Sequence, residues 1–264
     1  KGKFVHLHVH TEYSLLDGAN RIGELLDKAV ELNMDSIAIT DHGAMFGVIG
    51  FYKEAKKRGL KPVIGCEMYV APRGMRDKES RSDGNYTHLV LLAKNQKGYK
   101  NLMRLSSLGF TEGFYYKPRI DYETLAEHSE GLICLSACLA GDIPRLLQQG
   151  RYEDAIKTAL RMNEIFGQDN FYLELQDHGI EQQKTINEEL LKLSRDTGVP
   201  VVVTNDVHYT YEGDAESHDI LLCIQTQKKV SDENRMRYEG GQYYLKSPEE
   251  MYELFPYAVE ALEN

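Results

Sequence analysis

Three histidines alternate with apolar residues near the start of the chain. His6, His8 and His10 are each separated by a single residue within the run 4–10. In an extended strand alternate side chains point to the same face, so the three imidazoles would project together. Imidazoles, with a pKa of about 6.5, are common metal ligands, and two histidines spaced this way on one face suit zinc-type ions. A metal site is the favoured interpretation, and a hydrogen-bonded structural trio is the alternative.

Other residues able to bind metal lie at or near the ends of predicted strands. In barrels and open α/β sheets, ligands gather at the C-terminal ends of parallel strands, so residues far apart in sequence would converge there. His88 is the exception, because it begins its predicted strand. The residues that fit the pattern are His8, His10, Asp41, His42, Glu67, Cys138, Asp177, His178, Asp206 and His208.

Each of these residues also has a structural interpretation. Asp41 could cap a turn, Asp17 precedes a glycine and fits a turn, and Glu67 could be an exposed strand residue. Cys66 and Cys138 could be small buried apolar side chains, which is the usual role of a free cysteine. Their joint placement at successive strand ends nevertheless favours one shared site.

The elements that must position these residues alternate along the chain. Short apolar runs predict strands, and apolar residues three and four apart predict helices. The predicted strands are 4–10, 36–40, 62–70, 88–93, 132–136, 171–175 and 199–204, and the predicted helices are 22–32, 48–58, 99–108, 152–166 and 181–197. This alternation indicates an α/β protein with a parallel sheet, either doubly wound or closed as a barrel. Beyond residue 211 the order changes to a helix at 214–225, a charged span at 228–241 and a helix from 248.

Composition narrows the class of protein. A length of 264 residues suits one large domain. The net charge of -10 argues against a basic surface that holds nucleic acid by itself, so bound cations would attract a phosphate ester. Four irregularly spaced cysteines suit a reducing cytosol, and no apolar run predicts a membrane span or secretion. The first residue is not Met and the last helical pattern has no stop signal, so we expect a domain cut from a longer protein.

Five short segments resemble the motifs of a known family. They are HVH at 8–10, TDHG at 40–43, GCE at 65–67, SACLAG at 136–141 and TNDVHY at 204–209. They are similar to motifs of the polymerase and histidinol phosphatase (PHP) superfamily. Longer strings at 4–18, 40–52 and 113–121 resemble one branch, the N-terminal PHP domains of bacterial DNA polymerase III α subunits. The resemblance covers essentially the whole chain and implies a distorted seven-stranded (β/α)7 TIM-like barrel, with the metal site at the C-terminal ends of the strands.

The resemblance also implies roles for individual residues. His6 would have a supporting role, while Asp177 and His178 match no ligand position and remain candidates for substrate contact. Residues 1–264 would form a single PHP domain of a longer polymerase, with 214–264 as a C-terminal extension toward the polymerase palm. The implied metal ligands are His8, His10, Asp17, His42, Glu67, His88, Cys138, Asp206 and His208, and all nine positions hold a residue able to bind metal.

The chemistry follows from this set of donors. Five imidazoles, three carboxylates and one thiolate exceed the needs of one tetrahedral ion, so we expect two or three divalent ions that share ligands. Zinc is the first choice, and manganese or iron would also suit the donors. Such ions activate a water and clamp phosphoryl oxygens, and Glu67 is the expected bridging ligand. Lys117 and Arg119 could neutralise a substrate phosphate, the alternative being solvated surface charges.

The predicted reaction is metal-dependent phosphoester hydrolysis. The resemblance favours a cytoplasmic 3′→5′ exonuclease that proofreads a DNA 3′ end, with the other polymerase domains and replisome subunits as partners. One alternative is hydrolysis of pyrophosphate or a small phosphomonoester, and another is a non-catalytic, metal-stabilised scaffold that binds polymerase partners. Nucleotidyl transfer is not expected, because the chain contains no Asp-x-Asp strand.

Overall fold

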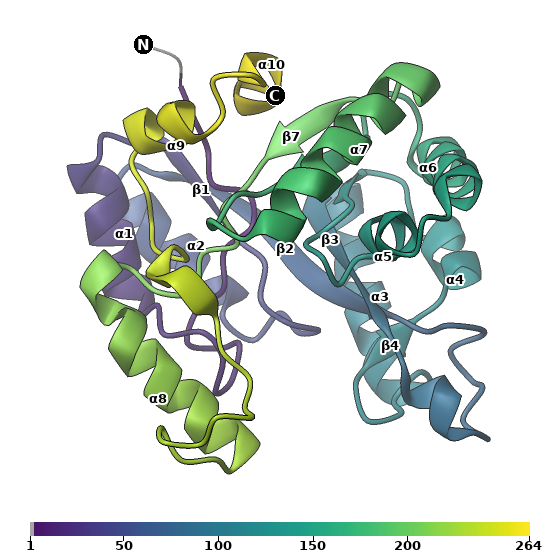
Figure 1. The fold of residues 1–264 in the computed structure, drawn as a ribbon, viewed down its shortest axis with the longest axis horizontal. Helices are drawn as coiled ribbons and strands as arrows, with labels where there is room; N and C mark the ends of the chain where they lie inside the picture. Colours follow the sequence, from purple (N-terminus) through teal and green to yellow (C-terminus); the bar gives the residue numbers. More distant parts are fainter. Residues whose placement is uncertain (1–2) are drawn as a thin grey trace.

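A curved mixed sheet flanked by helices forms the body of the molecule (Figure 1). The computed structural model describes residues 3–264. The strands are β1 Ser36–Ile39, β2 Lys61–Val70, β3 Thr87–Ala93, β4 Arg119–Ile120, β5 Leu132–Leu135, β6 Phe171–Leu175 and β7 Val201–Val203. The helices are α1 Ile22–Glu31, α2 Val48–Lys57, α3 Gln96–Thr111, α4 Tyr122–Glu127, α5 Asp142–Gln148, α6 Tyr152–Phe166, α7 Glu181–Thr197, α8 Ala215–Thr226, α9 Pro248–Leu254 and α10 Val259–Glu263, with 3-10 turns at Arg81–Gly84, Glu212–Asp214 and Glu239–Gly241.

Most of the predicted elements are confirmed. The helices predicted at 152–166 and 181–197 match α6 and α7 at both ends, and six of the predicted strands overlap β1, β2, β3, β5, β6 and β7. The two-residue β4 and the short helices α4 and α5 were not predicted, because each is too short to show a period in the sequence.

The sheet is not uniformly parallel, and in this respect the prediction was wrong. Along the order β1-β2-β3-β5-β6-β7 the pairs are parallel except at β3, which runs antiparallel to both β2 and β5. The short β4 pairs with β2 outside this order. The α/β class is therefore confirmed, but the strands of the described residues form a curled mixed sheet, and their pairings do not close it into the predicted distorted seven-stranded (β/α)7 barrel.

The predicted first strand is an extended segment without regular strand pairing. Its backbone nevertheless hydrogen-bonds to both edges of the sheet. On one side the Thr40 amide donates to the Val9 carbonyl at 2.8 Å, and on the other the His10 amide donates to the Val207 carbonyl at 2.8 Å. The segment thus lies between β1 and the residues that follow β7. Because its pairing is irregular, the strict alternation predicted for 4–10 does not hold: Leu7 packs against the inner apolar cluster.

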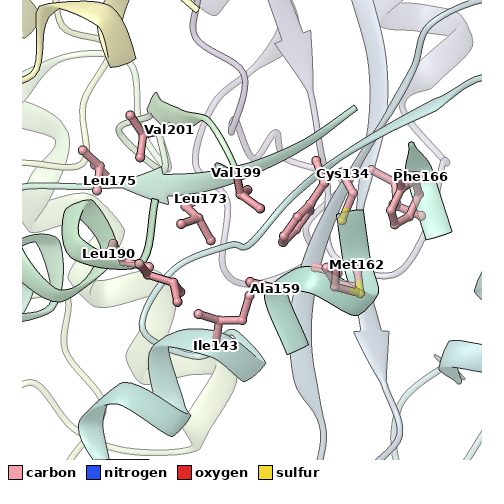
Figure 2. Close-up of a cluster of buried hydrophobic side chains, with 14 of the residues drawn as sticks. Cys134, Ile143, Ala159, Met162, Phe166, Leu173, Leu175, Leu190, Val199 and Val201 are labelled. Atoms are coloured by element: carbon pink, nitrogen blue, oxygen red, sulfur yellow. The ribbon is translucent and has the colours of Figure 1, made fainter. Parts of the chain in front are cut away.

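Strand alternation divides the core into an outer and an inner part. In β1, Ile37 and Ile39 pack under α1 and α2, whereas Ala38 between them faces an inner cluster with Val90 and Val202. A larger outer cluster packs β5, β6 and β7 against α5, α6 and α7 (Figure 2). Further along β2, the inward position of Glu67 is charged, in contrast to the partly buried Val63 near the start of the strand. The inside of the sheet is therefore apolar at one end and polar at the other.

No helix among the described residues is long and apolar enough to cross a membrane.

Candidate metal centre

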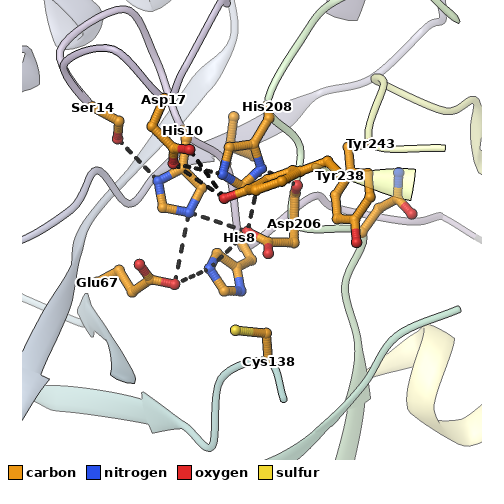
Figure 3. A network of polar contacts seen from close by, with 12 residues as sticks. His8, His10, Ser14, Asp17, Glu67, Cys138, Asp206, His208, Tyr238 and Tyr243 are labelled. Atoms are coloured by element: carbon orange, nitrogen blue, oxygen red, sulfur yellow. Dashed lines mark hydrogen bonds and ion pairs between the residues drawn. The ribbon is translucent and has the colours of Figure 1, made fainter. Parts of the chain in front are cut away.

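All nine predicted ligands lie at the polar end of the curved sheet, and seven of them are labelled in Figure 3. Two come from the extended N-terminal segment and one from the turn after it, and the others come from β2, the start of β3 and the loops after β1, β5 and β7. In that order they are His8 and His10, Asp17, Glu67, His88, His42, Cys138, and the pair Asp206 and His208.

The direction of β3 explains the unexpected position of His88. Because β3 is antiparallel to β2 and β5, its first residues lie at the same edge as the C-terminal ends of the parallel strands. The backbone amide of His88 donates to the carbonyl of Ala140 at 3.1 Å, which brings the histidine beside Cys138. Two explanations were open for His88, a wrong strand boundary or a strand of different orientation. The second is confirmed, because β3 begins only one residue before the predicted start and runs antiparallel to its neighbours.

The nine side chains form three overlapping groups, and within each group the ligand atoms lie within 4.8 Å of one another. His10 belongs to the first two groups, and Glu67 belongs to the second and third. The groups are His10, Asp17, His42 and His208; His8, His10, Glu67 and Asp206; and Glu67, His88 and Cys138. Shared ligands are what a cluster of two or three ions requires.

Glu67 lies at the middle of the cluster and is almost completely buried. Its Oε1 is 2.8 Å from His8 Nε2, 3.5 Å from His88 Nδ1 and 3.7 Å from His10 Nε2. Its other oxygen, Oε2, contacts His42 Nδ1. This placement between groups is the one that a bridging carboxylate would need.

Asp17 anchors the opposite side of the cluster. Its Oδ2 lies 2.5 Å from His42 Nε2 and 3.1 Å from His208 Nε2. The phenol of Tyr238 donates a hydrogen bond to Asp17 Oδ1 at 3.0 Å, and its ring packs edge-on against His208. Nothing in the sequence pattern around Tyr238 predicted this contact, because the residue lies in a charged, irregular span 221 positions away from Asp17.

His8 is held from behind by the carboxylate of Glu174. His8 Nδ1 lies 2.5 Å from Glu174 Oε1, and both Gln176 and Thr204 donate hydrogen bonds to the same oxygen. A carboxylate on one imidazole nitrogen fixes the ring and its tautomer, so that the other nitrogen presents a lone pair. Glu174 was not predicted, although a lone glutamate inside the apolar strand β6 was a signal that could have identified it.

His10 is held through a hydroxyl. His10 Nδ1 lies 3.0 Å from Ser14 Oγ, and Ser14 donates a hydrogen bond to Asp41 Oδ1 at 2.7 Å. Thr11 adds a backbone and a side-chain hydrogen bond to the same carboxyl group. Asp41 therefore supports the ring of His10 from a distance and is not among the grouped ligands.

Shifted pKa values keep the three carboxylates of the cluster ionised and the imidazole of His10 neutral, which are the protonation states that bind a cation. Burial lowers the pKa of His10 to about 3, with further lowering by His42 and His208, so its imidazole is neutral. Burial would raise the pKa of Asp206, but His8 and His208 outweigh it and hold that pKa well below its usual range. Neighbouring histidines lower the pKa of Asp17 and Glu67 in the same way, again against the effect of burial.

Four buried polar atoms that face the cluster make no hydrogen bond, although they face one another in two nitrogen–oxygen pairs. They are His10 Nε2, His42 Nδ1, Glu67 Oε2 and Asp206 Oδ1. Buried polar atoms are normally paired, and orphaned nitrogen and oxygen atoms that converge on one point fit bound cations. Cys138 agrees with this, because burial and the nearby Asp206 raise the pKa of its thiol, which only a cation would convert to a thiolate ligand. The donors present therefore fit divalent metal ions.

The structure places the remaining candidates outside the cluster. His6 is buried, with Nε2 at 2.8 Å from the Lys246 carbonyl, which agrees with a supporting role. His178 contacts the Asn205 carbonyl at 2.7 Å and stacks on Tyr243, while Asp177 accepts a hydrogen bond in its own turn. The contacts of His178 and Asp177 are therefore with other parts of the fold, and neither residue belongs to the ligand groups.

The two predicted phosphate contacts differ from each other. Arg119 is fully buried and donates to the backbone carbonyls of Gly113, Asp83, Met75 and Asp77, so its guanidinium is out of reach of a substrate. That position fits a structural role, which corrects the expectation. Lys117 is half-buried at the rim of the cluster.

Comparison with known proteins identifies the family. Residues 6–178 match the family model described as the PHP domain. The chain belongs to the PHP family. This PHP domain is 53% identical to the DNA polymerase III subunit alpha of Borreliella burgdorferi and 50% identical to that of Treponema pallidum. The alignments cover 100% and 99% of this chain but only 23% and 22% of the two relatives, so the chain spans less than a quarter of their length.

Solved structures show a weaker likeness to this PHP domain. An amidohydrolase from Chromobacterium violaceum, with bound sulfate and no metal, is 15% identical with a TM-score of 0.47. The match covers 77% of this chain and 87% of the other. Similarity at this level carries no functional argument.

Proposed function

We propose that this PHP domain is a metal-dependent phosphoesterase that removes nucleotides from a DNA 3′ end. The observation that carries the proposal is the set of three ligand groups that share His10 and Glu67 around four orphaned polar atoms. Two or three divalent ions, zinc before manganese or iron, would supply an activated water and charge stabilisation of the phosphoryl group.

The nine side chains of the cluster would hold the ions, and the rest of the chain keeps those side chains in place. Glu174 orients His8, Ser14 orients His10, and Tyr238 steadies Asp17 through its phenol. Because these contacts exist before any substrate arrives, little reorganisation is needed during the reaction. Lys117 lies at the rim, where its charge would meet a phosphate.

DNA is favoured over other phosphate esters because the relatives at about half identity are named DNA polymerase III subunit alpha. In a longer chain of that kind, residues 214–264 would lead toward the polymerase palm, and the other polymerase domains and replisome subunits would be the partners. Proofreading of a primer end is the role that an exonuclease would have in that setting.

A stabilising scaffold is the second candidate, and burial favours it. His8, His10, Glu67 and His208 are at most 1% exposed, so only the side formed by His42, His88 and Asp206 gives access to the cluster. Metal ions in a site this enclosed would contribute directly to folding stability.

The test is a degradation assay on the purified chain combined with elemental analysis of its metals. A 5′-labelled oligonucleotide should shorten from its 3′ end in added zinc or manganese. The variants D206N and H10A should lose about 10³-fold in rate, because each removes a ligand that contributes several kcal/mol. The control E164Q changes an exposed carboxylate on α6 and should retain full activity.

Three results would contradict the exonuclease. Degradation that persists unchanged in D206N would place the activity elsewhere. Turnover of pyrophosphate or a small phosphomonoester without release of nucleotides would indicate the other hydrolase. Metal binding that raises the thermal midpoint while every substrate remains intact would establish the scaffold.

A further inference from the structure

An exposed apolar and aromatic surface runs along α2, α3 and the loops beside them. Phe46, Phe110 and Phe114 are 62%, 41% and 48% exposed. Their rings form a row, with centroids 6.1 Å apart between Phe46 and Phe110 and 6.3 Å apart between Phe110 and Phe114. We define the α2–α3 strip as Phe46, Ile49, Tyr52, Met103, Phe110 and Phe114, all of them exposed.

The helices that carry this strip are basic, in contrast to the chain as a whole. Helix α2 holds three lysines and one glutamate, and α3 holds two lysines, one arginine and no acidic residue. Lys53, Lys56, Lys100 and Arg104 are exposed on these helices. The net charge of -10 for the whole chain therefore conceals a local surface of the opposite sign.

The strip continues to the rim of the metal centre. Beside Phe110, Gly109 approaches Pro118 so closely that a Cβ would lie 3.3 Å from the Pro118 carbonyl carbon. Next to Pro118, the Lys117 ammonium lies 5.6 Å from the centroid of the Tyr69 ring, and that ring stacks on His42 at 6.1 Å. An unbroken series of contacts thus joins the row of phenylalanines to a predicted ligand.

Away from the metal centre, the strip opens into a groove of about 610 Å³. Ile49 and Tyr52 line it from α2, Tyr99 lines it from α3, and Lys61 and Lys94 add two further positive charges. The surface is therefore elongated, with the metal centre at one end and a basic, aromatic groove at the other.

We propose that the α2–α3 strip binds the single-stranded segment of a DNA whose 3′ end enters the metal centre. Bases stack on Phe46, Phe110 and Phe114, and the exposed lysines and Arg104 neutralise the phosphates. The proposal rests on the proposed function for the direction of the strand, and it assigns to that function a substrate-binding surface.

The mixture of side chains distinguishes DNA from a protein partner. Stacked aromatic rings within a positive groove are the usual platform for single-stranded nucleic acid, where each stacked base contributes about 1–3 kcal/mol. The cores of protein interfaces are instead depleted of lysine. A surface that combines exposed phenylalanines with the basic helices α2 and α3 fits the first class better.

The test measures binding separately from hydrolysis. The anisotropy of a fluorescent oligothymidylate is followed in EDTA at low salt, where no turnover occurs. F46A, F110A and F114A should each weaken binding at least about fivefold, and the triple variant should weaken it further. The control Y257A removes an aromatic side chain that is equally exposed (55%) near the C-terminus and should bind as the unmodified chain does.

A pair of substitutions at one position separates stacking from apolar contact. F114W keeps an aromatic surface and should retain binding, whereas F114L keeps apolar character without a ring and should lose at least about fivefold.

The outcomes distinguish this proposal from the proposed function. If the chain binds oligothymidylate through the three phenylalanines but never cleaves it, the proposal for the strip holds and the proposed exonuclease activity is refuted. If binding is unchanged in the triple variant, or fully retained in F114L, the proposal that bases stack on the strip is overturned. Loss of self-association in sedimentation, with DNA affinity unchanged, would show that the strip docks a second copy and would also overturn the proposal.

Discussion

The metal centre and the α2–α3 strip are built on opposite physical principles. The centre is buried and polar, and two of its histidines are fixed by a further partner, His8 by Glu174 and His10 by Ser14. The strip is exposed and apolar, and its rings touch one another with few other constraints. The difference teaches that chemistry encoded by residue spacing can be found in a sequence, whereas a binding surface made from the outer faces of two helices emerges only when the helices are placed.

Removal of metal should give the largest difference between the two regions, because it should lower the stability of the chain without changing DNA binding by the strip. Metal that binds only the folded chain stabilises it by mass action, so a chelator should lower stability by about 4 kcal/mol relative to metal at a thousand times its Kd. For a domain of this size that corresponds to a fall of roughly 10 °C in the thermal midpoint. Calorimetry with and without EDTA measures it.

Oligothymidylate affinity should stay within about twofold in the same EDTA samples, because the strip contains none of the grouped ligands. A parallel loss of DNA affinity would mean that the two regions are not independent, and the comparison would fail.

Substitution of Glu174 should weaken metal affinity less than substitution of a direct ligand, but more than substitution of a surface acid. E174Q keeps the shape of the side chain but removes the negative charge behind His8, which should weaken metal affinity about 10- to 100-fold. Competition of the chain against a coloured chelator measures the affinity. E164Q is the matched control, and equal affinities in the two variants would show that Glu174 only fills space.

The pH dependence of the metal-free chain should show a maximum near neutrality. Burial lowers the pKa of His218 to about 4, so the unfolded chain binds its proton first and stability falls as the pH drops from about 6.5 to 4. Although burial opposes it, Glu67 and Asp17 raise the pKa of His42 to about 10. The folded chain then keeps this proton longer, and stability falls as the pH rises from about 6.5 to 10.

Each of these groups should contribute a slope of about 1.4 kcal/mol per pH unit, measured by urea unfolding in EDTA. H218Q should flatten the acid limb by about one proton. The triple phenylalanine variant should leave the whole curve unchanged, because it changes no titrating group. A metal-free stability that rises steadily through pH 9 would contradict the assignment of His42.

Much of the fold and most of the site could be predicted from the sequence. Helices such as α6 and α7 are long enough to show a clear period, and their ends were correct. The nine candidate ligands were identified from motif positions, and the structure brings all nine together. His88 was included on resemblance alone, and only the direction of β3 explains its place.

What could not be predicted depends on contacts between distant parts of the chain. Tyr238 reaches Asp17 from an irregular span, and no spacing links the two residues. Arg119 looked like a phosphate ligand because charge alone was visible, whereas its burial among four carbonyls appears only in three dimensions. Net charge also hides local differences, because it averages the basic α2 and α3 with an acidic remainder.

The hydrogen bonds that join the N-terminal segment to residues beyond β7 have a consequence for biosynthesis. His8 and His10 leave the ribosome early, but Val207 and His208 follow about 200 residues later, which is roughly 10–40 s at ordinary elongation rates. During that interval the first histidines have neither their neighbours nor their support. Metal capture is thus coupled to the synthesis of β7 and the residues that follow it, and a nascent chain that stalls before β7 cannot assemble the full set of donors.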